Sequence, residues 1–448
     1  MKPRPSFRVS GSRMLATLVV TLVFAVHAVA AASERVVYDF QPSNQYPPTG
    51  LVFDQAGNLY GPAYSSTGVG NIYRLSPPAH RGGKWTKATI FTFNGTNGAL
   101  PQASLIVDAK GNLFGVTFDG GTGNCNFNIP GCGVVFELSP PRHGKTWTET
   151  ILYDFQAPKD GTHPQSPLVF DAAGNLYGST IYGGDMSCAA ENGVGCGVVF
   201  ELSPSKTPGG AWTEKVLHAF HGGLDGVVPE GPLFFRDGML YGTTLQGGGG
   251  THCQAGCGIA FAVDRTGQEK VIHRFAGKDG GGPVGLTGDR AGNLFGVTDE
   301  GGQFEWGTIF ELKRSSGSNW TETLLYSFSG GRDGGNPTAM ISDDSGNLYG
   351  TTYTGGNPKD CGWEPPYMGC GVAFKLTAPN GPSTWTESVL HTFTGSTAPQ
   401  DPDGGIPWGV IFGKTGLLYG ATMIGGTGQC YTSMGINGGC GTVFVLAP

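Results

Sequence analysis

The stretch PLVFDAAGNLYGST at residues 167–180 decides the fold of this chain. It holds two apolar runs separated by the tetrapeptide DAAG. Gly174 supplies the left-handed backbone conformation that a tight hairpin needs, and Asp171 offers a carboxylate to the N–H groups of the turn. The stretch therefore predicts two antiparallel strands joined by a short turn.

The centre of this stretch recurs along the chain. Copies of the form GNLYG, GNLFG, GMLYG or GLLYG begin at Gly57, Gly111, Gly174, Gly238, Gly292, Gly346 and Gly416. Each is followed by a third apolar run such as GVVFEL (197–202), and all but the last by a fourth such as WTEKVLHAF (212–220). Runs rich in Val, Phe, Tyr, Trp and Thr between Gly and Pro clusters are typical of strands. The repeat thus predicts an all-β chain, a seven-bladed β-propeller of four-stranded blades with no helix outside the N-terminal segment.

The two ends of the repeat array favour a closed ring over an open β-solenoid. The seventh unit stops after its third strand, GTVFVL (441–446), whereas RVVYDF (35–40) is a fourth strand with no unit before it. The N-terminal strand is therefore expected to complete the last blade. Closure also protects sheet edges that would otherwise invite aggregation.

These units, of the type LVFDxxGNLYGTTxxGG…GxVFEL…WTExxLYxF, resemble the GloVer tandem repeats of bacterial secreted and surface proteins. The resemblance spans residues 35–448. It implies an exported, propeller-like protein. It implies no activity, so no catalytic residue is carried over from it. Some members are paired with a C-terminal anchor segment, and we do not expect one in this chain.

The N-terminus has the features of an export signal. A positive segment with Lys2, Arg4, Arg8 and Arg13 precedes the apolar run MLATLVVTLVFAV (14–26), and small residues at 28–30 offer a cleavage site. The apolar run is shorter than the roughly 20 residues that span a bilayer. The sequence therefore predicts a signal peptide at 1–30, one propeller domain at 31–448, and a periplasmic or secreted, monomeric protein with no membrane span after cleavage.

Composition excludes one class of partner. The chain has 79 glycines among 448 residues, 11% aromatic residues and a net charge of −7, without a basic patch. Such a glycine content with fixed positions fits a turn-rich β protein, and the charge argues against nucleic-acid binding.

The cysteines fall into five local pairs between the second and third strands of five units. An even count in loops of an exported protein predicts disulfides rather than thiolate metal sites, which need four ligands brought together. The predicted pairs are Cys125–Cys132, Cys188–Cys196, Cys253–Cys257, Cys361–Cys370 and Cys430–Cys440.

Loops after the second strand and connections between blades are expected on one face. The connections carry Asp-Gly motifs whose aspartates could form a carboxylate ring for a hard cation such as Ca²⁺, although an Asp-Gly turn repeated in nearly every blade is more simply part of the scaffold. These candidate metal ligands are Asp160, Asp225, Asp279, Asp333 and Asp403.

Unit five departs most from its neighbours, which identifies candidate site residues. Asp299 and Glu300 stand where other units have Ile-Tyr (181–182), Leu-Gln (245–246) and Tyr-Thr (353–354), and paired carboxylates can act as general acid and base. Exposed acidic loops and packed aromatic residues would explain the same pattern without a site. Candidate ligand-binding residues on this face are Glu305, Trp306, His163, Arg332, Trp363 and Tyr367.

Two functions remain open from the sequence. The first is a binding or scaffold module that recognises a glycan or surface polymer through its loop-rich face. The alternative is an exported propeller hydrolase or lyase with a cation or carboxylate centre.

Overall fold

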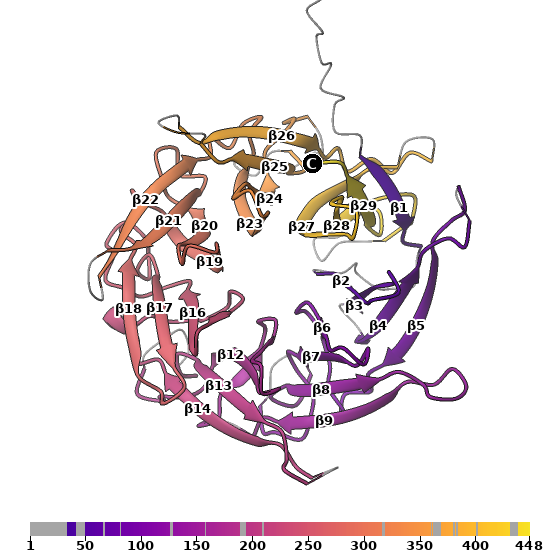
Figure 1. Ribbon diagram of the computed structural model, residues 1–448, viewed down its shortest axis with the longest axis horizontal. Helices are drawn as coiled ribbons and strands as arrows, with labels where there is room; N and C mark the ends of the chain where they lie inside the picture. Colours follow the sequence, from indigo (N-terminus) through magenta and orange to yellow (C-terminus); the bar gives the residue numbers. More distant parts are fainter. Residues whose placement is uncertain are drawn as a thin grey trace, which may run out of the picture. The chain divides into compact units, whose positions relative to one another are not determined.

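Seven antiparallel sheets form a closed ring in the computed structural model of the protein, and the strands of each sheet follow one another from the ring axis to the rim (Figure 1). The structure describes residues 34–41, 50–65, 68–80, 82–125, 129–156, 158–188, 194–207, 210–315, 319–359, 361, 369–379, 381, 384–399, 402–430 and 438–448. The predicted signal peptide lies outside these residues.

The first three blades follow the chain in order. Blade 1 contains β2 (Val52–Phe53), β3 (Leu59–Ser65), β4 (Gly68–Ser76) and β5 (Thr86–Thr92). Blade 2 contains β6 (Ile106–Val107), β7 (Leu113–Thr117), β8 (Val134–Ser139) and β9 (Thr148–Asp154). Blade 3 has its inner strand in two pieces, β10 (Thr162–Pro164) and β11 (Val169–Phe170), followed by β12 (Leu176–Tyr182), β13 (Val198–Ser203) and β14 (Thr213–Ala219).

The next three blades have the same order of strands. Blade 4 contains β15 (Phe234–Arg236), β16 (Met239–Thr244), β17 (Ile259–Asp264) and β18 (Glu269–Arg274). Blade 5 contains β19 (Gly281–Gly288), β20 (Leu294–Glu300), β21 (Thr308–Arg314) and β22 (Trp320–Ser327). Blade 6 contains β23 (Gly335–Ser342), β24 (Leu348–Thr354), β25 (Val372–Thr377) and β26 (Thr386–Thr392).

Blade 7 joins the two ends of the repeat array. Its sheet order is β1 (Arg35–Asp39), β29 (Thr442–Leu446), β28 (Leu418–Gly425) and β27 (Gly404–Phe412). β1 pairs antiparallel with β29, with Arg35 opposite Val445 and Asp39 opposite Thr442. The propeller fold and its closure by the N-terminal strand are therefore confirmed.

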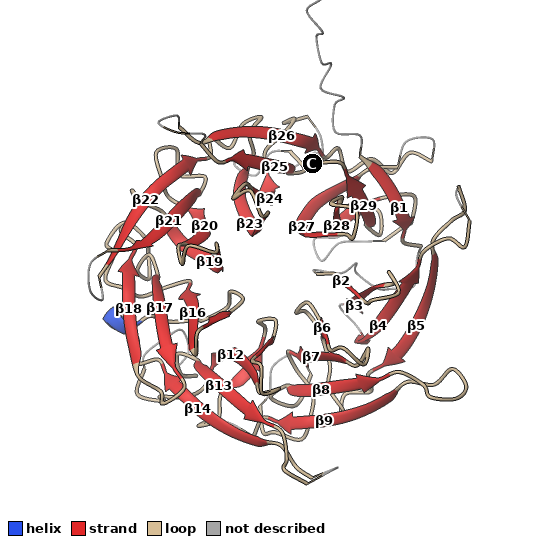
Figure 2. Cartoon of the chain, in the orientation of Figure 1, coloured by secondary structure: helices blue, strands red, loops and turns tan. Residues whose placement is uncertain are grey.

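Helix is almost absent from the described residues. The one helical element there is a 3-10 turn, η2 (Gly223–Asp225), in the connection after blade 3 (Figure 2). It is a small exception to the expectation of no helix.

The hairpin turn forms as the sequence predicts. Gly174 has φ 85°, and no heavy atom lies within 4 Å of where its Cβ would stand, so glycine is required here by conformation alone. Asp171 accepts the N–H of Ala173 (2.8 Å) and of Asn175 (2.9 Å) through Oδ1, and the Asn175 side-chain amide through Oδ2 (2.8 Å).

Aromatic rings hold adjacent blades together. The Phe that directly follows each outer strand packs against the aromatic residue of the third strand in the next blade, with centroids 4.9–5.4 Å apart at all seven junctions. The rings meet edge-on at six junctions and are tilted at the seventh, between Phe393 and Phe444. The second glycine of GNLYG makes room for that ring, since a Cβ at Gly178 would stand 2.6 Å from Phe200. Each such aromatic pair contributes about 0.5–1.5 kcal/mol beyond its buried area.

All five predicted disulfides are present, each between the second and third strands of its blade. No cysteine is free. Five disulfides are typical of proteins in an oxidising compartment outside the cytoplasm. No helix in the described part of the chain has the length and hydropathy to cross a bilayer.

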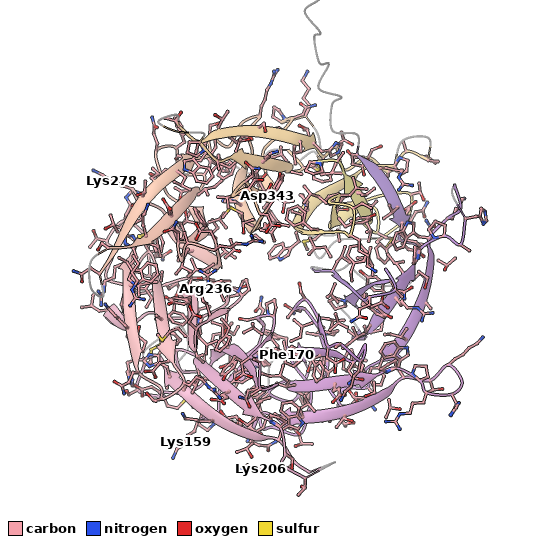
Figure 3. All side chains as sticks on the ribbon, in the orientation of Figure 1. Lys159, Phe170, Lys206, Arg236, Lys278 and Asp343 are labelled. Atoms are coloured by element: carbon pink, nitrogen blue, oxygen red, sulfur yellow. A yellow bond between two sulfur atoms is a disulfide. The ribbon has the colours of Figure 1, made fainter. Side chains whose placement is uncertain are left out.

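Side chains cover the ring from its rim to its inner strands (Figure 3). Lys159, Lys206 and Lys278 lie at the outer edge in this view, whereas Phe170, Arg236 and Asp343 lie nearer the centre.

Candidate functional site

The loops after the second strands and the connections between blades share one face, as predicted, and we call it the loop face. In blade 3, for example, the N–H of Gly184 donates to the carbonyl of Pro158 (2.7 Å), which lies in the connection entering the blade. The same contact joins Gly302 to Gly277 (2.8 Å) in blade 5.

A ring of residues in the left-handed conformation surrounds the axis on this face. In blades 2 to 7, the residue just before the inner-strand proline has φ between 53° and 61°; these residues, which we call the left-handed ring, are Leu100, His163, Val228, Gly282, Asn336 and Ile406. Only one of them is glycine. Such backbone strain costs about 1–3 kcal/mol per residue and is often found at functional sites.

Hydrogen bonds from the preceding blade hold this strained conformation. The N–H of His163 donates to the carbonyl of Cys132 (2.9 Å), and the N–H of Ile406 donates to that of Cys370 (2.8 Å). In blade 5, which has no disulfide, Trp306 supplies the carbonyl for Asn336 (2.9 Å). The disulfide cysteines therefore also position the inner strand of the next blade.

The residue after each inner-strand proline lines a cavity of about 270 Å³ on the axis. Residues from all seven blades border this cavity. We call the post-proline set the axial layer; its members are Gln102, Gln165, Glu230, Val284, Thr338 and Trp408. The position after the proline recurs in six blades, yet it carries five different kinds of side chain.

Glu230 is the one acidic residue of the axial layer. Its Oε1 accepts a hydrogen bond from Gln165 Nε2 (2.8 Å), so the neighbouring blade orients the carboxylate. Burial raises the pKa of Glu230. Sequence analysis did not single out Glu230 or Gln165; the signal that would have found them is the change of residue type after a repeated proline.

Asp299, a predicted catalytic candidate, lies at the end of β20 beside this layer. Its carboxylate occupies the space that a side chain at Gly282 would fill. Burial, followed by the charges of Glu300 and Glu230, raises the pKa of Asp299 to about 7. Within the described residues its buried Oδ1 has no hydrogen-bond partner, while Asn336 Nδ2 donates to its main-chain carbonyl (2.7 Å).

Glu300, the second catalytic candidate, does not share the position of Asp299. Its side chain is exposed, and it lies over Gly281, where a Cβ would be 3.1 Å from its Cγ. Successive residues of a strand point to opposite sides, which separates the two carboxylates. Blade 2 also has an acidic residue at the position of Glu300, namely Asp119, which sequence analysis overlooked.

Asp119 pairs with His163, a predicted ligand-binding residue, inside the protein. The two side chains are 0% and 4% exposed, and Nε2 of the imidazole lies 3.4 Å from Oδ1. Burial lowers the pKa of His163 to about 4 and raises that of Asp119 to about 6. The imidazole also packs between the rings of Phe118 and Tyr182.

The other ligand-binding candidates lie away from the axis. Glu305 pairs with His252 on the surface (3.1 Å), and Trp306 packs over Gly330 in the connection between blades 5 and 6. Arg332 is exposed in a shallow groove that also contains Lys359. Trp363 and Tyr367 fall outside the described residues.

The five candidate metal ligands each belong to a different connection between blades. Each carboxylate accepts a main-chain N–H of its own connection and a Tyr or His side chain from the preceding strand. Asp160, for example, accepts Tyr153 Oη (2.8 Å) and the N–H of Gln156 (2.9 Å). The carboxylates build these connections, and the structure does not bring the five together.

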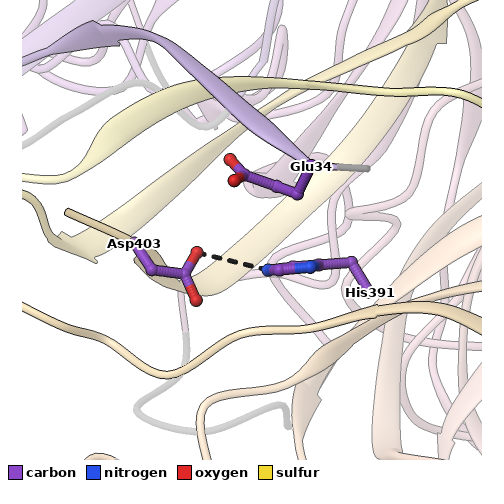
Figure 4. A group of neighbouring side chains, drawn as sticks. All are labelled: Glu34, His391 and Asp403. Carbon is purple, nitrogen blue, oxygen red and sulfur yellow. Dashed lines mark hydrogen bonds and ion pairs between the residues drawn. The ribbon is translucent and has the colours of Figure 1, made fainter. Parts of the chain in front are cut away.

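Two of them do lie in small groups that have the ligand types of a metal site. Asp403 lies with His391 and Glu34 at the junction of blades 6 and 7 (Figure 4), and Asp225 lies with His218 and Glu269 between blades 3 and 4. In each group, the potential ligand atoms are within 4.8 Å of one another. His391 Nε2 contacts Asp403 Oδ1 at 3.3 Å.

Comparison with solved structures identifies the fold. A catalytically inactive variant of virginiamycin B lyase from Staphylococcus aureus, with quinupristin, matches 93% of this chain and 100% of its own with TM-score 0.53 and 12% identity. An ulvan lyase from a new polysaccharide lyase family matches 92% of this chain and 95% of its own with TM-score 0.48 and 10% identity. A protein of unknown function from Dyadobacter fermentans matches 93% and 99% with TM-score 0.42 and 12% identity.

At 12% identity, the match to the virginiamycin B lyase variant shows a shared propeller fold and says nothing about activity. Among curated proteins, none matches the sequence. The model of the Gloeobacter/Verrucomicrobia repeat matches residues 21–256 and 250–448, which together span nearly the whole chain. Together with the seven repeated blades, this match shows that the chain belongs to the Gloeobacter/Verrucomicrobia repeat family.

Proposed function

We propose that the protein is an exported, monomeric binding module that holds a sugar ring of a glycan or surface polymer in its axial cavity. The observation that carries the proposal is the axial layer. Here the repeat changes its side chain from blade to blade, whereas the strands, turns and junctions around it are constant.

The chemistry of the lining suits a sugar. Trp408 contributes an aromatic side chain to the lining, and Gln102, Gln165 and Glu230 contribute polar side chains of the kind that hydrogen-bond hydroxyl groups. Ligand sites combine apolar and aromatic surface with a few convergent polar groups in this manner. The cavity is smaller than the roughly 300–1,000 Å³ of sites for drug-sized ligands, so one sugar residue is the fitting unit.

Tryptophan fluorescence and calorimetric titration of the full chain test this proposal. The probes are dextran, alginate and chitosan oligosaccharides, which are neutral, anionic and cationic. Trp408→Ala is expected to lower affinity for the bound polymer at least about ten-fold, the effect of losing one stacked aromatic ring.

Trp306→Ala is the matched control, because it removes a tryptophan of the loop face away from the axis. Loss of binding in Trp306→Ala with full binding in Trp408→Ala would place the ligand over blades 5 and 6 and contradict the axial proposal. Absence of binding to all three polymers would contradict it as well.

A hydrolase or lyase with a carboxylate centre is the second candidate, and the pKa of Asp299 favours it. A carboxyl group with a pKa of about 7 can both release and accept a proton near neutral pH. The same incubations, assayed for new reducing ends and unsaturated products, test this alternative. It predicts product release that Asp299→Asn abolishes without weakening polymer binding.

A further inference from the structure

The axial cavity has a one-sided charge. Glu230 contributes a carboxyl group to its lining, and no lysine, arginine or histidine of the described residues lines it. A cavity of this kind disfavours anionic ligands, because a buried negative charge repels them without compensation.

The carboxylate of Glu230 is only partly satisfied by the protein. Gln165 Nε2 donates to Oε1 (2.8 Å), and within the described residues Oε2 receives no hydrogen bond. The nearby hydroxyl of Ser166 is already used, since it donates to the main-chain carbonyl of Glu230 (2.9 Å). Glu230 is therefore oriented by one neutral amide and has capacity to accept a further donor.

Asp299 adds a second carboxyl group close enough for the charge of Glu230 to act on it. Its Oδ1 is buried and has no hydrogen-bond partner among the described residues. The one histidine of the left-handed ring, His163, lies beside Asp119 (Nε2 to Oδ1 3.4 Å), and burial lowers its pKa to about 4, so at neutral pH it is uncharged and neutralises neither group.

An aromatic ring completes the arrangement. Trp408 lines the same cavity from blade 7, and a cation is attracted to the face of an indole ring. A ligand with a protonated nitrogen would therefore gain a charge-assisted hydrogen bond to Glu230 and a favourable contact with Trp408.

We propose that the axial cavity selects a sugar residue with a free, protonated amino group, as in a de-N-acetylated amino-sugar polymer. This inference rests on the proposed function and names the ligand class of that same cavity. Neutral and acidic sugars of the same shape leave Glu230 desolvated and unpaired, so they bind more weakly.

Calorimetric titration of the full chain with three matched monosaccharides tests the inference. Glucosamine, N-acetylglucosamine and glucose have the same ring, but only the first is charged at neutral pH. Glucosamine is expected to bind at least ten-fold more tightly than the other two. This comparison uses the unaltered protein, so it does not depend on the folding of any variant.

Glu230→Gln, which keeps the shape of the side chain, is expected to lower glucosamine affinity to that of N-acetylglucosamine. Asp344→Asn is the matched control, since it removes one negative charge from a side chain that is 86% exposed. Glucosamine affinity unchanged in Glu230→Gln would overturn the inference.

The outcomes also separate the inference from the proposed function. If all three sugars bind equally and Trp408→Ala weakens them all, the axial glycan site stands and the requirement for charge is overturned. If none of them, nor chitosan oligosaccharides, binds in a way that depends on Trp408, both are overturned.

Discussion

Position 282 shows how a single residue can make one blade differ from the others. Every member of the left-handed ring carries a side chain except the member in blade 5, Gly282, which has φ 59°. The carboxylate of Asp299 occupies the space that this glycine leaves. The carboxylate of Asp299 can therefore occupy its position near the axis only because Gly282 has no side chain.

Gly282→Ala should accordingly destabilise the protein in two ways. Alanine in a left-handed conformation costs about 1–2 kcal/mol, and its Cβ would also displace the Asp299 carboxylate. Gly174→Ala isolates the first cost, because its φ is 85° and nothing lies within 4 Å of the added Cβ.

Denaturant unfolding of both variants measures the difference. We expect Gly282→Ala to lose at least about 1 kcal/mol more stability than Gly174→Ala, the scale of forcing an extra methyl group into a filled site. Equal losses would show that Asp299 does not require the space.

Among the elements, the outer strands carry a repeated glutamate, which is the last residue of the motif WTE in four blades. The motif alone does not reveal what surrounds this side chain. At five junctions this glutamate reaches the connection of the preceding blade, and its buried Oε1 has no hydrogen-bond partner in the described structure; the residues are Glu149, Glu214, Glu269, Glu322 and Glu387. Blade 1 has Lys87 instead, which lies over the rings of Phe40 and Tyr73 at the closing junction.

Burial raises the pKa of these glutamates, and nearby aspartates add to the effect at several junctions. The pKa rises from 4.5 to about 7 for Glu149, for Glu214 beside Asp160 and for Glu387 beside Asp333. A protonated glutamate can donate to a neighbouring carboxylate, whereas two ionised groups repel each other.

The sign of the resulting pH dependence follows from proton binding. Between pH 4.5 and about 7 the folded state binds protons that the unfolded chain has released. The stabilisation is therefore complete below pH 4.5 and is lost as the pH rises through about 7. Asp119 and Asp299 act in the same direction, whereas His163 opposes them as the pH falls from 6.5 through about 4.

We expect the triple variant Glu149→Gln, Glu214→Gln, Glu387→Gln to show a flatter dependence of Tm on pH than the parent. The substitutions remove these linked protonations. The Tm of the parent should therefore fall by a few degrees more than the Tm of the variant between about pH 5 and pH 8. Thermal unfolding across this range is the measurement, with Asp344→Asn as the control for an exposed acid. A parent whose Tm changes with pH as little as that of the variant would contradict this account.

At the scale of the whole molecule, closure depends on a strand that comes from the other end of the chain. Phe40 is 5% exposed and packs against Tyr73 of blade 1, so β1 both completes blade 7 and joins it to blade 1. Without β1, the edge of β29 would be unpaired and this aromatic contact would be lost.

A circular permutant tests whether geometry or chain order matters for closure. Because Arg35 lies opposite Val445, a short glycine linker can join Pro448 to residue 34, and the chain can begin at residue 50. The permutant should unfold within about 5 °C of the parent, since β29 and β1 become a hairpin like the outer hairpins of the other blades.

Deletion of residues 34–41 without the permutation is the paired experiment. We expect this variant to unfold at a much lower temperature and to aggregate through the exposed edge of β29. A deleted chain as stable as the parent would show that the ring does not need its closing strand.

The sequence by itself determined the propeller, its closing strand and the five disulfides, because each of these depends on local chemistry repeated at regular spacing. An Asp-x-x-Gly turn, an alternating strand or a pair of cysteines a few residues apart can be recognised without knowing what lies across the ring. Only the tertiary structure decided the candidate site. Gln165, Glu230 and Trp408 are dozens of residues apart in the chain, and they meet because every blade directs its post-proline residue to one axis. Asp299 and Glu300, by contrast, are adjacent in sequence and are kept apart by the local alternation of side chains along β20.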